Sequence, residues 1–213
     1  MREVTVPPAL ASGMRSKWVL IAAAAVVALL GARAALGYRG PASKSLDSRA
    51  AAAASAMAAS IPPADDPHAI PSRLDQAARG ARSAGRKWRS DAVLTQIIAA
   101  SDSAPSGGTY RVQFEFRSPT DGAGVALTTG ASGDAKSERM NAIPMSSIRA
   151  LPDTFIDLPA AVDAARKAGM YGGLREGKLA SITSRGALRP AWRVRRESDR
   201  SLMYYIGASS GAG

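Results

Sequence analysis

The sequence predicts an α+β fold in which two units, each of one helix and three antiparallel strands, follow a single transmembrane helix. Three features predict this class: an apolar run near the N-terminus, a strict period-two alternation over residues 110–117, and the order helix, strand, strand, strand, which occurs twice. The predicted parts are a tail over 1–17, the transmembrane helix over 18–38, a linker over 39–71 and a two-unit domain over 72–213.

The apolar run extends from Trp18 to Tyr38 and contains a single charge, Arg33. At a rise of roughly 1.5 Å per residue, a helix of this length crosses the hydrocarbon core of a bilayer. Trp18 and Tyr38 are placed as anchors at the two membrane interfaces, and Arg33 lies close enough to one end to extend its charge into the interface. The run therefore predicts a single-pass protein of the cytoplasmic (inner) membrane with its C-terminal domain outside the cytoplasm.

Two other interpretations of this run stay open. Its uninterrupted core is short, and Ala32-Arg33-Ala34 has the spacing of a signal-peptidase site, so the run could be a cleaved signal peptide of a secreted or periplasmic protein. The third interpretation is a buried core helix, although the run is apolar on all sides. Basic residues flank it at both ends, so charge does not decide its orientation.

Residues 39–71 are predicted to form a linker rich in Ala, Ser and Pro. The stretch 51–59 has the composition of a helix but no large apolar face to bury, and prolines follow it at 62, 63, 67 and 71. His68, the only histidine, lies here beside Asp65 and Asp66. Because a linker gives no rigid frame for ligands, we expect these residues to be solvated rather than to bind metal.

The first predicted unit covers about 72–133. It begins with a helix for which Ser72 is the candidate N-cap and in which apolar residues recur at helical spacing as far as Trp88. Strands are expected over 92–99, 109–116 and 125–130. In the second of these strands, the alternation of aromatic and aliphatic residues with charged ones is typical of an antiparallel strand with one buried face.

The second predicted unit covers about 156–211. Its helix is expected over 158–170, with Asp157 at the start because acidic residues favour the first turn. Three strands follow, over 177–185, 190–196 and 201–208. In the middle strand, period two places Trp192 and Val194 on one face and Arg193 and Arg195 on the other.

The second unit resembles a PepSY domain in the helix "DLPAAVDAARKAG" and in the strands "GKLASI", "RPAWRV" and "YYIGASSG". The first unit looks like a degenerate partner copy, and the tandem is similar in outline to the architecture of beta-lactamase inhibitory protein. The resemblance implies a helix packed across an antiparallel sheet, and extracytoplasmic domains that bind or inhibit rather than catalyse. Gly207 stands where that family commonly has an aspartate, so no role of that carboxylate carries over.

The sequence offers no catalytic constellation. Cysteine is absent and the single histidine falls in the predicted linker, which leaves thiolate, Ser-His-Asp and Cys-based zinc chemistry without candidates. Phosphate-loop, nucleophile-elbow and zinc-protease motifs are also absent. A carboxylate pair among Asp153, Asp157 and Asp163 is the remaining candidate. We therefore expect a protein that is not an enzyme and has no cofactor, metal or small-molecule substrate.

The net charge of +11 favours an anionic partner. Arg193 and Arg195, with Tyr205 on the next strand, are the candidate contacts for a protein partner with an acidic surface. Two alternatives are the anionic headgroups of the membrane lipid bilayer and an ordinary solvated basic face. Nucleic acid is not the expected partner, because a stacking platform needs aromatic residues and cations on one face and Trp192 lies opposite the arginines.

Taken together, these features predict a membrane-tethered, extracytoplasmic binding or accessory module without catalytic activity. An alternative of another class is a secreted inhibitor, or a chaperone-like module that acts on a hydrolase after signal-peptide cleavage. A nucleic-acid-binding protein is the third interpretation.

Overall fold

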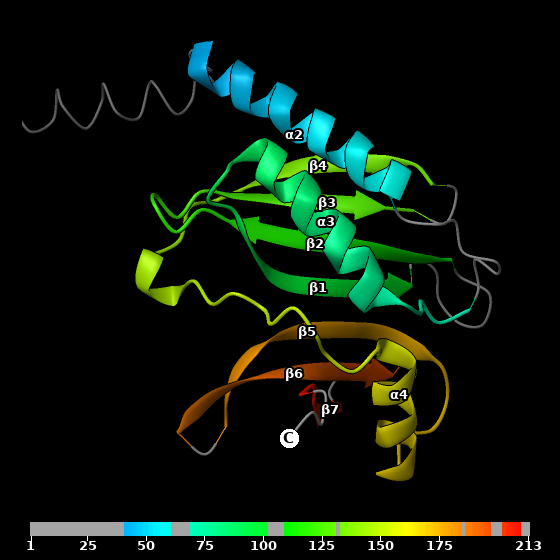
Figure 1. Ribbon diagram of the computed structural model, residues 1–213. Helices are drawn as coiled ribbons and strands as arrows, with labels where there is room; N and C mark the ends of the chain where they lie inside the picture. The colour runs from blue at the N-terminus through cyan, green and yellow to red at the C-terminus, as the bar shows by residue number, and fades with distance from the viewer. Residues whose placement is uncertain are drawn as a thin grey trace, which may run out of the picture. The chain divides into compact units, whose positions relative to one another are not determined.

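The computed structural model describes residues 41–60, 69–101, 109–130, 133–184, 186–196 and 202–209 (Figure 1). The helices in this part of the chain are α2 (Pro41–Ser60), α3 (Leu74–Trp88), the 3-10 helix η1 (Met145–Ser147) and α4 (Leu158–Lys167). The strands are β1 (Val93–Ser101), β2 (Tyr110–Arg117), β3 (Gly124–Thr129), β4 (Ala135–Met140), β5 (Leu174–Ser184), β6 (Ala187–Arg196) and β7 (Met203–Gly207). The described residues from Ser45 onward belong to one compact unit.

The strands form one seven-stranded antiparallel sheet in the order β4-β3-β2-β1-β5-β6-β7. At its centre β1 pairs with β5, from Gln96 opposite Ala180 to Ala100 opposite Glu176. This pairing joins the meander that follows α3 to the meander that follows α4 (Figure 1). The prediction of two helix-plus-three-strand units is therefore wrong: the strands share one sheet, four of them follow α3, and α2 precedes α3.

The predicted transmembrane helix is the second correction to the fold class. Within the described ranges, no helix is long and apolar enough to cross a membrane. The run from Trp18 to Tyr38, its two predicted anchor residues and the tail over 1–17 lie outside the described residues. A transmembrane, single-pass architecture thus has no support from the structure.

Much of the predicted linker over 39–71 is the helix α2. Ala50, Ala53, Ala54 and Met57 recur at spacings of three and four, are each at most 2% exposed and belong to the hydrophobic core. This stripe is almost entirely alanine, which buries little area per residue, so its packing was not evident from composition. His68, Asp65 and Asp66 lie outside the described residues.

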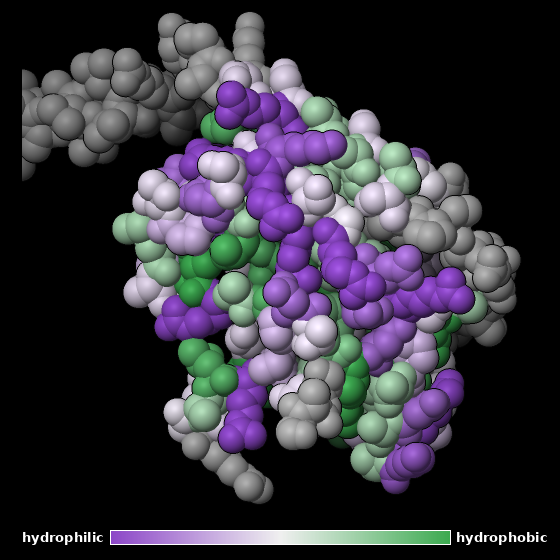
Figure 2. Space-filling view, in the orientation of Figure 1, coloured by the Kyte–Doolittle hydropathy of each residue, from purple (hydrophilic) through white to green (hydrophobic). Residues whose placement is uncertain are grey.

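The sheet has a covered face and an open face. Helix α3 packs on β1 and β2, and α4 packs on β6 and β7. The strand side chains beneath the helices form the core: Leu94, Ile97, Phe114, Phe116, Leu127, Leu179, Trp192 and Val194. No helix of the described residues packs on the opposite side, which we call the open face. Figure 2 shows the helix-bearing side, where hydrophilic side chains follow the outer surface of α3 and Arg79, Arg86 and Lys87 are exposed.

Helix α3 approaches the sheet closely at Gly85. The helix buries one stripe that includes Leu74, Ala81 and Trp88, and Gly85 lies on the same stripe. A Cβ atom at Gly85 would lie 2.5 Å from Cδ1 of Phe116, which is closer than non-bonded carbon atoms approach. The absence of a side chain at this position therefore sets the distance between α3 and β2.

We expect Gly85→Ala to lower the free energy of unfolding by about 1–3 kcal/mol, because the added methyl group displaces the Phe116 ring or the helix. The steric cost of the methyl group would outweigh the gain in helix propensity of about 1 kcal/mol that alanine brings relative to glycine. Urea unfolding followed by far-UV circular dichroism measures the difference. Gly207→Ala is the matched control, since a Cβ there meets nothing within 4 Å. Equal losses in the two variants would contradict the close contact.

One carboxylate caps both α3 and α4. Oδ1 of Asp157 accepts hydrogen bonds of 3.0 Å from the amides of Leu158 and Leu74, and Oδ2 accepts one from the amide of Arg73. The predicted place of Asp157 at the start of α4 is confirmed. Ser72, in contrast, is not the cap of α3: the cap position is Arg73, which makes no side-chain cap bond and has a left-handed backbone with φ of 57°.

Trp192 holds the segment before α4 against the covered face of the sheet. Its side chain is fully buried, and its indole N–H donates a 2.8 Å hydrogen bond to the carbonyl oxygen of Ile156. Its ring meets the ring of Phe155 edge to face, with centroids 6.3 Å apart. Trp192 thus fixes the segment that leads into α4 against the covered face.

Candidate partner-binding face

The three residues predicted to contact a partner lie together on the open face. Arg193 and Arg195 alternate along β6 with the buried residues Trp192 and Val194. The strand register places Arg193 directly between Lys178 of β5 and Tyr205 of β7. Tyr205 is 58% exposed. The predicted residues therefore form one continuous surface with Lys178 as an additional cation.

Both arginines share one carboxylate, Glu176. Nη2 of Arg193 donates to Oε1 at 2.9 Å, and Nη2 of Arg195 donates to Oε2 at 3.0 Å. The Glu176 side chain is 17% exposed, and those of Arg193 and Arg195 are 33% and 28% exposed. The Nε atoms of both arginines are buried and make no hydrogen bond with the described part of the chain. One negative charge thus orients two guanidinium groups and neutralises half of their charge.

Sequence reasoning did not identify Glu176 as the shared partner. The alternation of Glu176 and Lys178 with the buried residues Gly177 and Leu179 would have placed it on a solvent-facing side. Its position opposite Arg195 follows from the pairing register of β5 with β6, which period-two counting within one strand does not reveal.

The open face continues as a polar surface across the other strands. Paired residues form a row from β4 to β7: Lys136, Thr128, Gln113, Ile98, Lys178, Arg193 and Tyr205. Basic residues outnumber acidic ones on the described strands of this face, with Arg111, Arg117, Lys136, Lys178, Arg189, Arg193 and Arg195 against Glu115, Glu138 and Glu176. This excess gives the face a positive potential.

Two carboxylates hold the turn between β2 and β3. Asp91 accepts hydrogen bonds from the hydroxyl groups of Ser118 at 2.6 Å and Thr120 at 2.7 Å, and these bonds lower the pKa of Asp91 below its usual value. A hydrogen bond from the amide of Ala123 is the main cause of the lowered pKa of Asp121. Groups that stay ionised at neutral pH and serve as turn acceptors are poorly suited to general acid-base catalysis.

The three acidic residues offered as a carboxylate pair have separate structural partners. Asp157 caps two helices, Asp153 pairs with Arg82 at 3.5 Å, and Asp163 pairs with Arg166 at 3.4 Å. Among the described residues, no group of histidine and acidic side chains is arranged to hold a metal ion.

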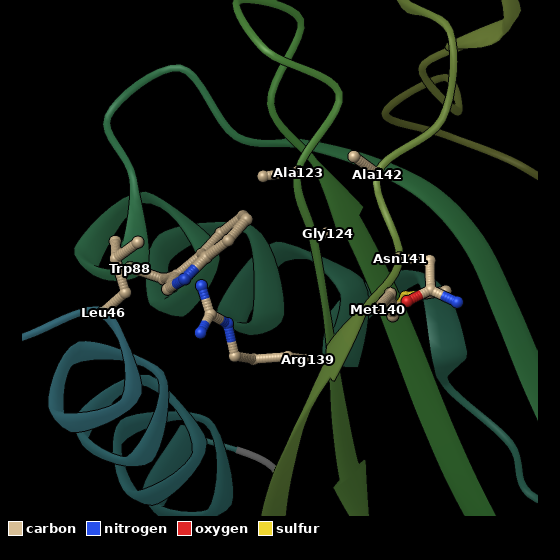
Figure 3. A pocket seen from close by; sticks show the side chains of 8 residues that line it. All are labelled: Leu46, Trp88, Ala123, Gly124, Arg139, Met140, Asn141 and Ala142. Carbon is tan, nitrogen blue, oxygen red and sulfur yellow. The ribbon is translucent and has the colours of Figure 1, made fainter. Parts of the chain in front are cut away.

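A cavity of about 380 Å³ lies between α2, α3 and the β3–β4 edge of the sheet. Its lining includes Leu46, Trp88, Arg139 and Asn141 (Figure 3). The guanidinium group of Arg139 points toward Trp88 and Leu46, whereas the Asn141 side chain points away. Arg139 also pairs with Asp47 at 3.6 Å. Since small-molecule sites combine apolar walls with several converging polar groups, we assign no ligand to this cavity.

No protein-family model, no curated protein and no solved structure matches this chain. The resemblance to a PepSY domain and to beta-lactamase inhibitory protein therefore stays a prediction.

Proposed function

We propose that this protein is a non-catalytic binding module whose open sheet face docks the acidic surface of a protein partner. The observation that carries the proposal is the sharing of Glu176 by Arg193 and Arg195. Because one carboxylate serves two guanidinium groups, positive charge remains at a fixed, half-buried position. A carboxylate of the partner can bind there as a second acceptor.

The hydrogen bonds to Glu176 also reduce the cost of binding. Long arginine side chains lose rotamer freedom when a partner immobilises them, and that loss opposes association. At this face Arg193 and Arg195 are already held by Glu176, and Lys178 flanks them on β5. An acidic partner therefore meets oriented donors, and its affinity should fall as salt screens the exposed part of the interaction.

The open face fits a protein better than a nucleic acid. Single-stranded nucleic acids are bound by several aromatic side chains on which successive bases stack. Tyr205 is the only aromatic residue on this face in the described strands, and Trp192 is buried on the other side. The face thus combines charge with a single aromatic ring, which suits carboxylate recognition.

Binding of the full chain to a fluorescently labelled short polyglutamate peptide tests the proposal. We expect the double variant Arg193→Gln, Arg195→Gln to bind about tenfold more weakly, because hydrogen bonds to charged groups contribute about 1.5–3 kcal/mol when buried and less when half-exposed. The matched control is Arg79→Gln with Arg86→Gln, which removes the same charge from the exposed surface of α3. Its affinity should change by less than about twofold.

If the two double variants lost peptide affinity equally, the net charge of the protein alone would account for its attraction to the peptide. That result would refute the proposed site. An oligonucleotide of equal charge that binds more tightly than the peptide, through the same two arginines, would assign the face to nucleic acid instead.

A further inference from the structure

We propose that the acidic partner binds as an extended segment that adds a strand to the free edge of β7. This inference rests on the proposed function, since it names the kind of acidic segment that reaches Arg193 and Arg195. In the sheet order, β7 is the terminal strand and pairs only with β6 among the described strands. Edge strands with free backbone groups are templates for strand addition.

The register shows which backbone groups of β7 are free to pair. The amide of Ala208 donates to the carbonyl oxygen of Pro190 at 3.0 Å, which makes these two residues a hydrogen-bonded pair. In an antiparallel ladder such pairs alternate, so Tyr204 and Ile206 direct their N–H and C=O groups toward β6. The intervening residues Met203, Tyr205 and Gly207 direct theirs away from the sheet.

The two edge strands of the sheet, β4 and β7, differ in whether they carry charged side chains that discourage pairing with another strand. The β4 edge carries Lys136, Glu138 and Arg139, and charged side chains of this kind protect an edge from other strands. Near the β7 edge, in contrast, Leu202, Met203 and Tyr205 are 41%, 40% and 58% exposed. Within the described residues 202–209, the β7 edge is therefore apolar, exposed and without charged side chains, which marks it as the edge adapted for a partner.

The positive charge of the open face determines which side chains the added strand should carry. On the open face, side chains of a strand beside β7 would lie next to Met203 and Tyr205, one strand away from Arg195 and Arg193. Acidic residues at alternate positions of that strand would be met by these arginines. A second copy of this chain would instead bring two sets of arginines together, and each copy carries a net charge of +11. The partner is thus an extended segment with acidic residues on one face and apolar residues on the other.

A short peptide in which valine and glutamate alternate is the probe, used with the full chain. We expect binding to slow amide hydrogen exchange at Met203, Tyr205 and Gly207, while Tyr204 and Ile206, already paired with β6, change little. A peptide of the same sequence, N-methylated at alternate backbone nitrogens, should bind about tenfold or more weakly, because it loses donors to the β7 carbonyls.

A protein variant gives a second, independent readout. Met203→Pro removes one outward N–H at the first residue of an edge strand, where proline is tolerated. We expect about tenfold weaker peptide binding with an unchanged far-UV circular dichroism spectrum. Met203→Ala keeps the backbone donor and serves as the matched control. If Met203→Pro does not fold, the N-methylated peptide still tests the proposal on the unmodified protein.

The outcomes separate this inference from the proposed function. Suppose that the N-methylated and unmodified peptides bind with equal affinity, that Tyr205 is not protected, and that binding still depends on Arg193 and Arg195. This result would refute strand addition at the β7 edge and leave the proposed function standing. Edge protection that is unaffected by Arg193→Gln with Arg195→Gln would refute the charged face instead. Protection of Tyr205 that rises with protein concentration in the absence of peptide would make a second copy the occupant, and would also overturn the proposal.

Discussion

Replacing Trp192 with alanine is expected to lower the free energy of unfolding by about 3–5 kcal/mol, a loss typical of a large aromatic residue removed from a core. The Trp192 side chain is fully buried, so the variant would leave a cavity between β6 and the segment before α4. It would also leave the carbonyl oxygen of Ile156 without its 2.8 Å donor and Phe155 without its edge-to-face neighbour.

Two further variants separate the causes of this loss. Trp192→Phe keeps most of the apolar volume but removes the indole N–H, and should cost about 1–3 kcal/mol. Tyr205→Ala removes an aromatic side chain from the open face of the neighbouring strand, where Tyr205 is 58% exposed, and should cost at most about 0.5 kcal/mol. Urea unfolding followed by circular dichroism measures all three. If Trp192→Ala and Tyr205→Ala were equally destabilising, the assignment of the two faces of the sheet would be wrong.

Asp157→Ala is expected to lower the free energy of unfolding by about 2–3 kcal/mol, because the carboxylate accepts hydrogen bonds from the first amides of two helices. Loss of one N-cap typically costs about 1 kcal/mol, and each helix also loses a negative charge beside its positive end. Amide hydrogen exchange should become faster in the first turns of both α3 and α4. Faster exchange in α4 alone would show that Asp157 caps only its own helix.

Asp163→Ala is the control for this prediction. Asp163 lies on the same helix, but its side chain is 65% exposed and pairs with Arg166 at 3.4 Å. Exposed pairs of this kind contribute little, so the change should stay within about 0.5 kcal/mol. Asp157→Asn keeps one acceptor oxygen without the charge and should fall between the two alanine variants.

Local sequence pattern was sufficient for several individual elements. The alternation over 110–117 predicted a strand where β2 lies, because Phe114 and Phe116 are buried on the covered face. Asp157 was placed at the start of α4 by the preference of acidic residues for first turns. In both cases a short-range rule acts on residues whose surroundings lie within the same element.

Other elements depend on contacts that no local pattern encodes. β4 reads "AKSERM", with exposed and half-buried residues on both faces, because it is an edge strand and needs no apolar alternation. α2 packs through alanines that also suit a linker. The single sheet arises from the pairing of β1 with β5, and the sequence shows two meanders without showing that they pair with each other.

The candidate site was predictable in part for the same reason. Period two along β6 placed Arg193 and Arg195 together and opposite Trp192, which the structure also does. Glu176 required knowledge of the register between β5 and β6. Partners across a sheet are therefore set by long-range pairing, whereas the face on which a residue lies is set locally.

The pairing of β1 with β5 also determines how the chain must fold. Each meander can form early through its own turns, but β1 and β5 lie far apart in sequence, and closing so long a loop is slow. On the ribosome, α3 and β1–β4 are complete before β5 is synthesised. During that interval the long inner edge of β1, which includes Ile97 and Ile98, has no partner strand and is open to aggregation. Synthesis of the second meander ends this interval, because β5 then pairs with the exposed edge of β1. In this way β5 protects the first half of the protein from pairing with other chains, as a chaperone would, but as part of the same chain.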